Sequence, residues 1–269
     1  MTEARGRKSI FITGAASGIG AETARLFASR GWFCGLADIN EAGLASVAEE
    51  IGTDNCMTTR LDVRDRDNWK ASLDKFGEAT EGRMNVLFNN AGIGRHGWFE
   101  DIPDSENDAI IDINVKGVIN GAKAAMPLLR QTNGARIVNT ASTAGMVGPP
   151  QLAVYSASKF AVRGLTEALD VELSNVGIRC TTLMPWFIET PILDMGLTEG
   201  SNVKMSDQIR DAGQDVYPVS LAAERAWDAA HGKDVHYMAG KQAERARFAQ
   251  RFMPKRLKKQ LEKNLPPRS

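Results

Sequence analysis

Apolar residues follow two different periods along this chain. Short runs of consecutive apolar residues, of the kind that form buried strands, alternate with longer segments in which apolar residues recur every three or four positions, as in amphipathic helices. The alternation extends over residues 8–239 without an internal repeat or a Pro-, Gly- or Ser-rich linker. It predicts a single α/β domain in which a parallel sheet is covered by helices.

The individual runs locate the expected elements. Strands are predicted at residues 8–13, 32–38, 55–61, 84–90, 135–142, 177–185 and 234–239. Helical periodicity is clear at residues 21–30, 109–129, 152–173 and 221–230. A polar, mixed segment at residues 186–218 has a helical pattern only near residues 204–212. The domain is expected to span residues 1–240, with residues 241–269 as a separate C-terminal tail.

Composition excludes some classes of protein. Hydrophobic residues make up 43% and charged residues 25% of the 269 residues, as in ordinary soluble proteins, and 33 basic residues balance 33 acidic ones. The total charge therefore does not indicate nucleic-acid binding. The N-terminal residues lack the apolar core of a signal sequence, and no run approaches the ~18 apolar residues of a membrane span. We expect a cytoplasmic protein.

Cysteine and histidine usage does not indicate a metal. Cys34, Cys56 and Cys180 lie in apolar, strand-like runs without C-x-x-C spacing, so we interpret them as small buried hydrophobic residues. The three histidines are too scattered for a zinc site, which needs three or four converging ligands. No metal is predicted.

The tail at residues 241–269 is strongly basic. Its ten basic and two acidic residues give a net charge of +8, which leaves −8 for the rest of the neutral chain. Phe248 and Phe252, and then Leu257, Leu261 and Leu265, are each four residues apart, which predicts two short amphipathic helices with a break near Pro254. We expect the tail to dock on the acidic body or on a neighbouring subunit. A membrane-surface helix is the alternative, although the apolar faces are short.

A glycine-rich segment follows the first predicted strand. It runs from Gly14 through Ser17, Gly18 and Ile19 to Gly20, directly before the first helix. Missing side chains let the backbone approach a pyrophosphate, and the free N–H groups at the start of a helix favour its negative charge. A tight strand-to-helix turn without a ligand is the alternative interpretation.

Asp38 ends the second strand, eighteen residues after Gly20. An acidic residue at about this spacing accepts hydrogen bonds from the ribose of NAD and repels the 2′-phosphate of NADP. The next residues, Ile39 and Asn40, supply no arginine for that phosphate. NAD is therefore the predicted cofactor, unless Asp38 only caps the helix that begins at Glu41.

Three further residues form a candidate catalytic group. Tyr155 and Lys159 are four residues apart in a helical segment and share one face. An ammonium beside a phenol favours the phenolate and lowers its pKa, so the pair can exchange a proton near neutral pH. Ser142 follows the fifth strand, which places its hydroxyl at the sheet edge where open α/β sheets bind ligands.

The S-x12-Y-x3-K arrangement, together with T-G-x-x-x-G-I-G and N-N-A-G, resembles the short-chain dehydrogenase/reductase (SDR) family over roughly residues 8 to 240. The resemblance implies one Rossmann domain with strand order 3-2-1-4-5-6-7. It also implies that Asn114 completes a catalytic set with Ser142, Tyr155 and Lys159, in which Tyr155 is the general acid and base.

The resemblance implies a set of NAD-binding residues as well. It consists of Gly14, Ser17, Gly18, Ile19, Gly20, Asp38, Asp62, Val63, Asn90, Ala91, Gly92, Tyr155, Lys159, Pro185, Ile188 and Thr190. Residues 186–218 correspond to a mobile flap over the substrate. A homo-oligomer, either a tetramer or a dimer, is expected, with residues 109–129 and 152–173 forming the contacts between subunits.

Trp186 departs from the family pattern, in which a glycine usually follows the equivalent of Pro185. The nearby Met184, Phe187 and Met146 are apolar, so we expect the indole to form a wall of the substrate pocket. A lipophilic or aromatic secondary alcohol, or the corresponding ketone, is then the predicted substrate. The alternative is that the indole packs under the flap as part of the core.

Two other functions remain open. A dehydratase or epimerase on the same scaffold uses a similar Tyr and Lys, but its glycine loop usually reads G-x-x-G-x-x-G. A dinucleotide-sensing protein without catalytic activity commonly lacks the tyrosine. The predicted function is an NAD-dependent alcohol dehydrogenase or ketone reductase.

Overall fold

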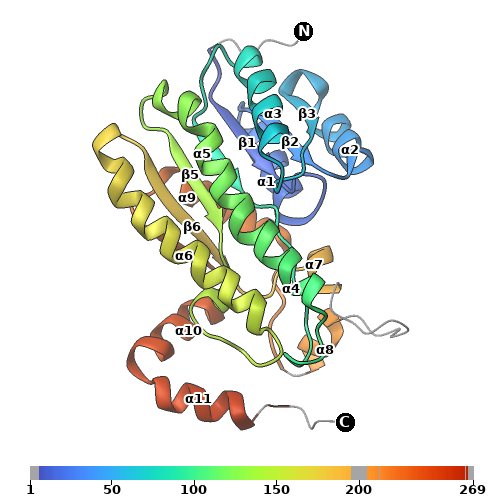
Figure 1. Cartoon of the computed structure of the whole chain (residues 1–269), viewed down its shortest axis with the longest axis vertical. Coiled ribbons are helices and arrows are strands. Elements are labelled where there is room, and N and C mark those ends of the chain that lie inside the picture. The colour runs from blue at the N-terminus through green and yellow to red at the C-terminus, as the bar shows by residue number, and fades with distance from the viewer. Residues whose placement is uncertain (1–5, 195–204, 212, 264, 266–269) are drawn as a thin grey trace.

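A seven-stranded parallel sheet forms the centre of the molecule (Figure 1). The computed structural model describes residues 6–194, 205–211, 213–263 and 265. The strand order is β3-β2-β1-β4-β5-β6-β7, which confirms the predicted order. The strands are β1 Ser9–Thr13, β2 Phe33–Asp38, β3 Cys56–Arg60, β4 Val86–Asn89, β5 Arg136–Thr140, β6 Arg179–Pro185 and β7 His236–Ala239.

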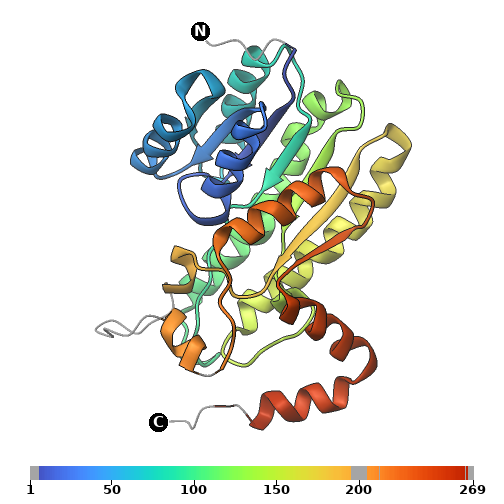
Figure 2. The same ribbon diagram turned by 180° about the vertical axis from the view of Figure 1, so that it is seen from behind.

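Helices cover both faces of the sheet, as parallel strands require. One face carries α1 (Gly18–Ser29), α2 (Glu41–Ile51) and α9 (Val219–His231), which Figure 2 shows from behind. The opposite face carries α3 (Arg66–Ala79), α5 (Gly117–Arg130) and α6 (Ala153–Leu173). A π-helical turn, Asp112–Lys116, joins α4 (Asp104–Ile111) to α5.

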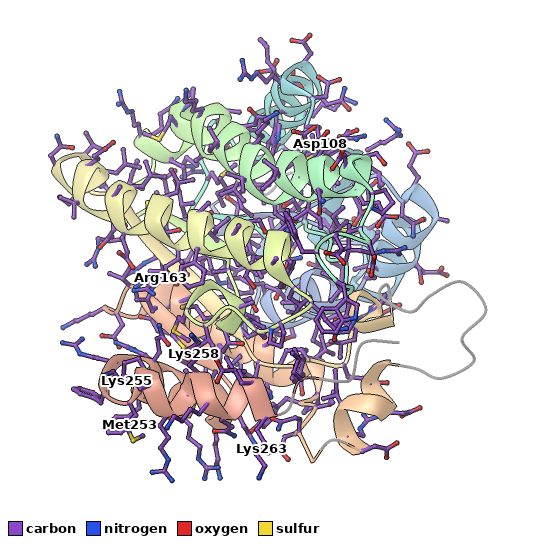
Figure 3. All side chains as sticks on the ribbon, turned by 60° about the horizontal axis from the view of Figure 1, so that its bottom comes forward. Asp108, Arg163, Met253, Lys255, Lys258 and Lys263 are labelled. Carbon is purple, nitrogen blue, oxygen red and sulfur yellow. The ribbon has the colours of Figure 1, made fainter. Side chains whose placement is uncertain are left out.

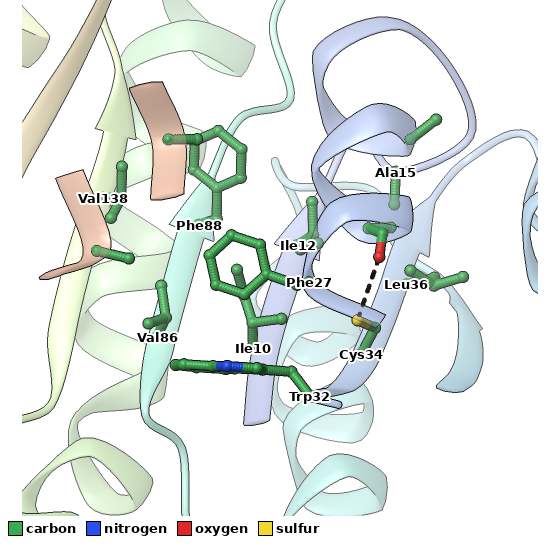
Figure 4. Close-up of a cluster of buried hydrophobic side chains, with 14 of the residues drawn as sticks. Ile10, Ile12, Ala15, Phe27, Trp32, Cys34, Leu36, Val86, Phe88 and Val138 are labelled. Atoms are coloured by element: carbon green, nitrogen blue, oxygen red, sulfur yellow. Dashed lines mark hydrogen bonds between the residues drawn. The ribbon is translucent and has the colours of Figure 1, made fainter. Parts of the chain in front are cut away.

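Alternate residues of β1 pack on opposite faces of the sheet. Ile10 and Ile12 pack with Phe27 and Trp32 in the cluster beneath α1 and α9 (Figure 4), whereas Phe11 packs on the other side of the sheet. The rings of Phe27 and Trp32 meet edge to face with centroids 5.0 Å apart. Cys34, in the same cluster, is a free thiol and fully buried. Cys56 and Cys180 are also free and buried, as predicted.

The segment at residues 186–218 contains two short helices, α7 (Pro191–Asp194) and α8 (Met205–Asp211). The second agrees with the helix expected near residues 204–212. Ile188 and Tyr217 form a parallel bridge that closes the two ends of this segment on each other. Residues 195–204 and 212 of the predicted flap lie outside the described residues.

Two helices form the C-terminal tail, α10 (Lys241–Phe252) and α11 (Pro254–Lys263), and the break falls at Pro254 as predicted. Ala243 in the first turn of α10 is fully buried against the body. Beyond that turn the tail extends away from the sheet, and α11 contacts α10 (Figures 1 and 2). In the described part of the chain, no helix combines the length and the apolar character that a bilayer crossing needs.

Candidate functional site

The glycine-rich turn between β1 and α1 is closely packed. Gly14 and Gly18 have φ angles of +67° and +53°, which favour glycine. A Cβ atom on Gly20 would lie 2.1 Å from the carbonyl oxygen of Gly14, so no side chain fits there. Ser17 precedes α1 with an extended backbone, and its side chain makes no capping hydrogen bond. The N–H groups of the first helical turn are therefore available to an anion.

Hydrogen bonds between Thr13 and the residues after β4 join this turn to the end of that strand. The Thr13 hydroxyl oxygen accepts hydrogen bonds from the backbone N–H groups of Asn90 and Ala91, both at 3.0 Å. In return, the Asn90 amide donates to the Thr13 carbonyl at 3.0 Å. The predicted residues Asn90 and Ala91 are thus brought against the glycine-rich turn, whereas a Cβ atom on Gly92 would lie 3.1 Å from Asn114 Oδ1 and 3.5 Å from Lys159 Nζ. Thr13 was not predicted as a site residue, although it is the threonine of the T-G-x-x-x-G-I-G motif.

The segment after β6 closes the other side of the turn. A Cβ atom on Gly18 would lie 3.2 Å from the methyl group of Thr190. The Thr190 hydroxyl donates to the carbonyl of Ile188 at 3.2 Å. At the end of β6, the Pro185 carbonyl accepts a hydrogen bond from the Thr143 hydroxyl at 3.2 Å, next to Ser142. The ends of β1, β5 and β6 therefore meet around one site.

Asp38 lies at the end of β2 and faces the same turn. Its carboxylate accepts hydrogen bonds from the N–H groups of Ala16, at 3.1 Å, and Asn40, at 3.0 Å. The side chain of Asn40, not that of Asp38, caps α2 by accepting from the N–H of Gly43 at 3.1 Å. The capping alternative for Asp38 is therefore wrong.

The Asp62–Val63 turn after β3 is fixed by its neighbours. Arg64 forms an ion pair with Asp62 at 2.6 Å, and this hydrogen-bonded guanidinium lowers the pKa of the Asp62 carboxyl. Val63 is buried, and its carbonyl accepts from the Trp69 indole at 3.0 Å and from the Asn120 amide at 3.1 Å. Arg64 did not emerge from the sequence, because no motif marks it.

The candidate catalytic residues converge at the carboxyl end of β5. The Ser142 hydroxyl oxygen caps a short turn, Thr143–Gly145. The same hydroxyl lies close enough to the Tyr155 phenol to affect its pKa. Lys159, one helical turn after Tyr155 on α6, is only 4% exposed, and its ammonium nitrogen lies 5.6 Å from the centroid of the Tyr155 ring. It donates to the carbonyl of Thr140 at 2.9 Å.

Burial governs the proton affinities of this pair. It lowers the pKa of Lys159 from 10.5 to about 8. It also raises the pKa of Tyr155, an effect that the nearby Ser142 hydroxyl partly offsets. The sequence-based expectation that Lys159 lowers the pKa of Tyr155 differs from this result. The reason is desolvation, which disfavours the phenolate and the ammonium alike.

Asn114 lies in the π-helical turn and is only 1% exposed, so the solvent-facing alternative is wrong. Its amide group accepts from the N–H of Ile93 and donates to the carbonyl of the same residue, both at 2.9 Å. It also donates to the Ser158 hydroxyl at 3.0 Å. Ser158 lies between Tyr155 and Lys159 on α6, so Asn114 fixes the loop after β4 against the catalytic helix.

Trp186 packs beside the site and toward the tail. Its ring meets Phe187 edge to face with centroids 5.2 Å apart. It lies against a buried cluster that includes Met146 and Met184, as expected, and also Met238 and Ala243. The indole N–H is buried and has no hydrogen-bond partner among the described residues. Trp186 therefore links the end of β6 to the first turn of α10.

The arrangement fits a dinucleotide. Three glycines leave room for a phosphate beside an uncapped helix start, and a carboxylate stands at the end of the neighbouring strand. Among the residues that the structure describes, no group of three or more His, Cys, Asp and Glu side chains could hold a metal ion. The site can thus bind a dinucleotide and place a phenol, a hydroxyl and a buried amine beside it.

Comparisons with known proteins agree with this geometry. The family model described as short chain dehydrogenase matches residues 8–199. "Oxidoreductase UcpA" from Salmonella typhimurium is 40% identical over 190 residues, which are 70% of this chain and 72% of the relative.

Solved structures extend the similarity to the whole chain. A short chain dehydrogenase/reductase from Burkholderia phymatum in complex with NAD has a TM-score of 0.82 and 28% identity, with 100% of both chains covered. A 3-ketoacyl-(acyl-carrier-protein) reductase from Brucella melitensis, complexed with NADH, has a TM-score of 0.77 and 31% identity, covering 86% of this chain and 96% of that one. The chain therefore belongs to the short chain dehydrogenase family of oxidoreductases.

Proposed function

We propose that this protein is an NAD(H)-dependent oxidoreductase that interconverts a secondary alcohol and a ketone. The observation that carries the proposal is the convergence of Ser142, Tyr155 and Lys159 next to the glycine-rich turn. A phenol that lies beside a hydroxyl and near a buried amine suits proton transfer to and from an oxygen atom. Names of relatives that include dehydrogenases and reductases support this choice.

The cofactor is NAD, bound along the carboxyl edge of the sheet. Gly14, Gly18 and Gly20 let the backbone approach the pyrophosphate, with Ser17 and Ile19 at the start of the helix. Asp38 accepts hydrogen bonds from the adenosine ribose and repels a 2′-phosphate. When bound, NAD accepts a hydride from the alcohol carbon or returns one to the ketone carbon.

The remaining predicted residues surround the two ends of the cofactor. Asp62 and Val63 contact the adenine, and the loop after β4 forms the floor of the site. Tyr155 and Lys159 border the nicotinamide ribose. The segment after β6 holds the nicotinamide amide through Pro185, Ile188 and Thr190. The contact of Thr190 with the glycine-rich turn supports this assignment.

The chain's own residues handle the proton. Ser142 donates a hydrogen bond to the substrate oxygen, and Tyr155 takes the alcohol proton in oxidation and returns it in reduction. When Lys159 is protonated, its charge opposes the rise in the Tyr155 pKa that burial causes. Asn114 acts through other groups, because its amide is bonded to Ile93 and Ser158 and holds the catalytic helix in place.

The substrate is a lipophilic or aromatic alcohol or ketone. Trp186, Phe187 and Met146 supply an apolar surface beside the catalytic group. A dehydratase or epimerase is the second candidate, but its glycine loop usually differs from the one in this chain. A dinucleotide sensor without catalytic activity is less well supported, because all four catalytic residues are present and close together.

The test is NADH consumption, followed by absorbance, with a panel of ketones and with the reverse reaction on alcohols. Tyr155→Phe should lower kcat by about 10²- to 10⁴-fold, because it removes the acid and base, and should leave NADH binding nearly unchanged. Tyr237→Phe removes a hydroxyl on β7, away from the site, and should keep the wild-type rate.

Two outcomes would contradict the proposal. A Tyr155→Phe enzyme within a factor of a few of the wild-type rate would exclude Tyr155 as the acid and base. A kcat/KM with NADPH equal to or above that with NADH would show that Asp38 does not select the cofactor as proposed.

A further inference from the structure

The C-terminal tail carries a concentrated positive charge that the body does not neutralise. We call α10 and α11 together the arm. All of the arm's basic side chains in the described residues are exposed, namely Lys241, Arg245, Arg247, Arg251, Lys255, Arg256, Lys258, Lys259 and Lys263. The one inter-residue ion pair within the described part of the arm joins Lys258 to Glu262 at 3.7 Å. The arm therefore presents an excess of cations to its surroundings.

The arm also presents an aromatic pair. Phe248 is 57% exposed and Phe252 62% exposed, and their ring centroids are 4.8 Å apart. By contrast, Leu257 and Leu261 on α11 are already partly buried, and α11 contacts α10. The outward surface of the arm is thus cationic, with aromatic rings at one place. Met253 and Leu265 are exposed as well, but with Leu257 and Leu261 partly buried the arm has no continuous apolar face. An acidic protein surface therefore suits the arm better than insertion into a membrane.

An acidic surface of matching composition lies on the same protein, around the start of α4. Asp101, Asp104 and Asp108 are exposed, and none of them forms an ion pair with another described residue. Asp104 and Asp108 are four residues apart in α4 and therefore lie on one side of the helix, and Asp101 is in the turn just before it. Phe99, two residues before Asp101, is 67% exposed. The exposed carboxylates complement the basic side chains of the arm, and the exposed ring of Phe99 complements its aromatic pair.

The arm cannot reach this acidic surface within its own chain. Figure 3 shows Asp108 on the far side of α6 from the labelled arm residues Lys255, Lys258 and Lys263. The first turn of α10 is also anchored, because Ala243 is fully buried and the N–H of Lys241 donates to the Tyr217 hydroxyl at 3.2 Å. The complementary acidic surface must then belong to a different molecule.

We propose that the arm of one copy docks on the acidic surface at Asp101, Asp104 and Asp108 of a second copy of this chain. This surface adjoins the candidate active site, because Arg95 on the preceding loop pairs with Glu106 of α4 at 2.7 Å. The same loop passes Tyr155, whose ring a Cβ atom on Gly94 would approach to 3.3 Å. The docked arm therefore borders the partner's substrate entrance.

The contact is tested in the full-length protein by reversing the charges of the arm, then those of the acidic surface, and finally those of both in one protein. Lys255→Glu with Lys259→Glu reverses one side of α11, and Asp104→Lys with Asp108→Lys reverses the acidic surface. Each pair should raise the dissociation constant between copies by about tenfold or more, measured by analytical ultracentrifugation at low salt. The protein with all four changes should recover most of the lost affinity, because opposite charges face each other again.

A matched control carries Lys75→Glu with Lys233→Glu, two exposed lysines on other parts of the body. It changes the net charge by the same amount as the arm pair and should leave the dissociation constant unchanged. Circular dichroism and Tm verify that every variant folds. Because the contact is electrostatic, raising the salt concentration should weaken the wild-type association toward that of the arm variant.

Three results would overturn the proposal. The first is a wild-type mass of one chain, 29.2 kDa, at micromolar concentration. The second is an arm variant that associates as the wild type does, or a fourfold variant that does not recover. The third is wild-type binding to phosphatidylglycerol vesicles that the arm reversal abolishes while association stays unchanged, which would assign the arm to an anionic membrane.

Discussion

Lys159 is a buried amine whose ionisation opposes folding. Its pKa falls from 10.5 to about 8 on burial, so at neutral pH the folded protein holds a charge that water would stabilise better. Between these two values the unfolded chain keeps a proton that the folded chain has released. Raising the pH across this window therefore favours the folded state, and the destabilisation shrinks as the pH approaches 10.5.

Lys159→Met should accordingly raise stability while abolishing activity. The expected gain is up to about 3 kcal/mol at pH 7, since each pKa unit corresponds to ~1.4 kcal/mol, and the lost hydrogen bond to Thr140 reduces it. Urea denaturation at pH 7 and pH 10 measures the effect, and the difference from wild type should narrow at the higher pH. A variant less stable than wild type at pH 7 would refute this account.

Trp186 should determine substrate preference. If its indole forms a wall of the pocket, Trp186→Ala should change the kcat/KM ratio between bulky aromatic and short aliphatic substrates by about 1 to 3 kcal/mol. A uniform loss of kcat/KM for both substrate types, together with a lower Tm, would show a purely structural role. Its position in the cluster with Met184, Met238 and Ala243 makes that second outcome a real alternative.

Residues within a motif could be predicted from the sequence, whereas their partners could not. Ser142, Tyr155 and Lys159 have a diagnostic spacing, and the structure brings them together. Ser158 has no such spacing, because its contact with Asn114 joins segments that only the fold brings together. Arg64 pairs with Asp62, only two residues away, but no motif marks it. The rise in the Tyr155 pKa was also missed, because the burial that causes it cannot be read from local sequence.

At the scale of an element, the glycine-rich turn depends on the absence of one Cβ atom. Gly20→Ala places that atom 2.1 Å from the Gly14 carbonyl oxygen, so the turn must open. NADH binding should weaken by at least about tenfold, measured by protein fluorescence quenching. Gly148→Ala is the matched control, because a Cβ atom there meets nothing within 4 Å. Equal NADH affinity in the two variants would contradict this prediction.

Element positions followed well from periodicity, but their irregularities did not. The predicted strand at residues 32–38 agrees with β2, and the break at Pro254 separates α10 from α11. The π-helical turn around Asn114 was not predicted as such, because a single turn of five residues is too short to show a period of its own. Only the unfavourable asparagine in the middle of a helix indicated a special position.

For the whole molecule, the exposed side of α6 predicts association between subunits. Phe160 is 43% exposed and Val171 75% exposed, and a stripe of small exposed residues accompanies them on the same helix. Ala168→Arg should lower the mass found by light scattering, because an arginine prevents close approach of two such helices. Ala71→Arg, at an exposed position of α3, should not. An unchanged mass in the Ala168→Arg variant would exclude this face.

The strand order followed from family resemblance and is confirmed, since parallel strands with helical crossovers allow few topologies. The surface on which the arm packs could not be predicted in the same way. Its amphipathic pattern is compatible with several docking surfaces, and the sequence contains no signal that selects one of them. The high charge alone indicated that the arm does not belong to the core.

The double role of Asp38 limits attempts to engineer cofactor preference. Its carboxylate holds the N–H groups of Ala16 and Asn40 in the structure, in addition to its proposed contact with the ribose. A designer who replaces it with a neutral residue removes the repulsion of a 2′-phosphate but also releases the loop that receives the pyrophosphate. Asp38→Asn keeps an acceptor for one N–H group, so it is a better starting point for evolving NADPH use than Asp38→Ala.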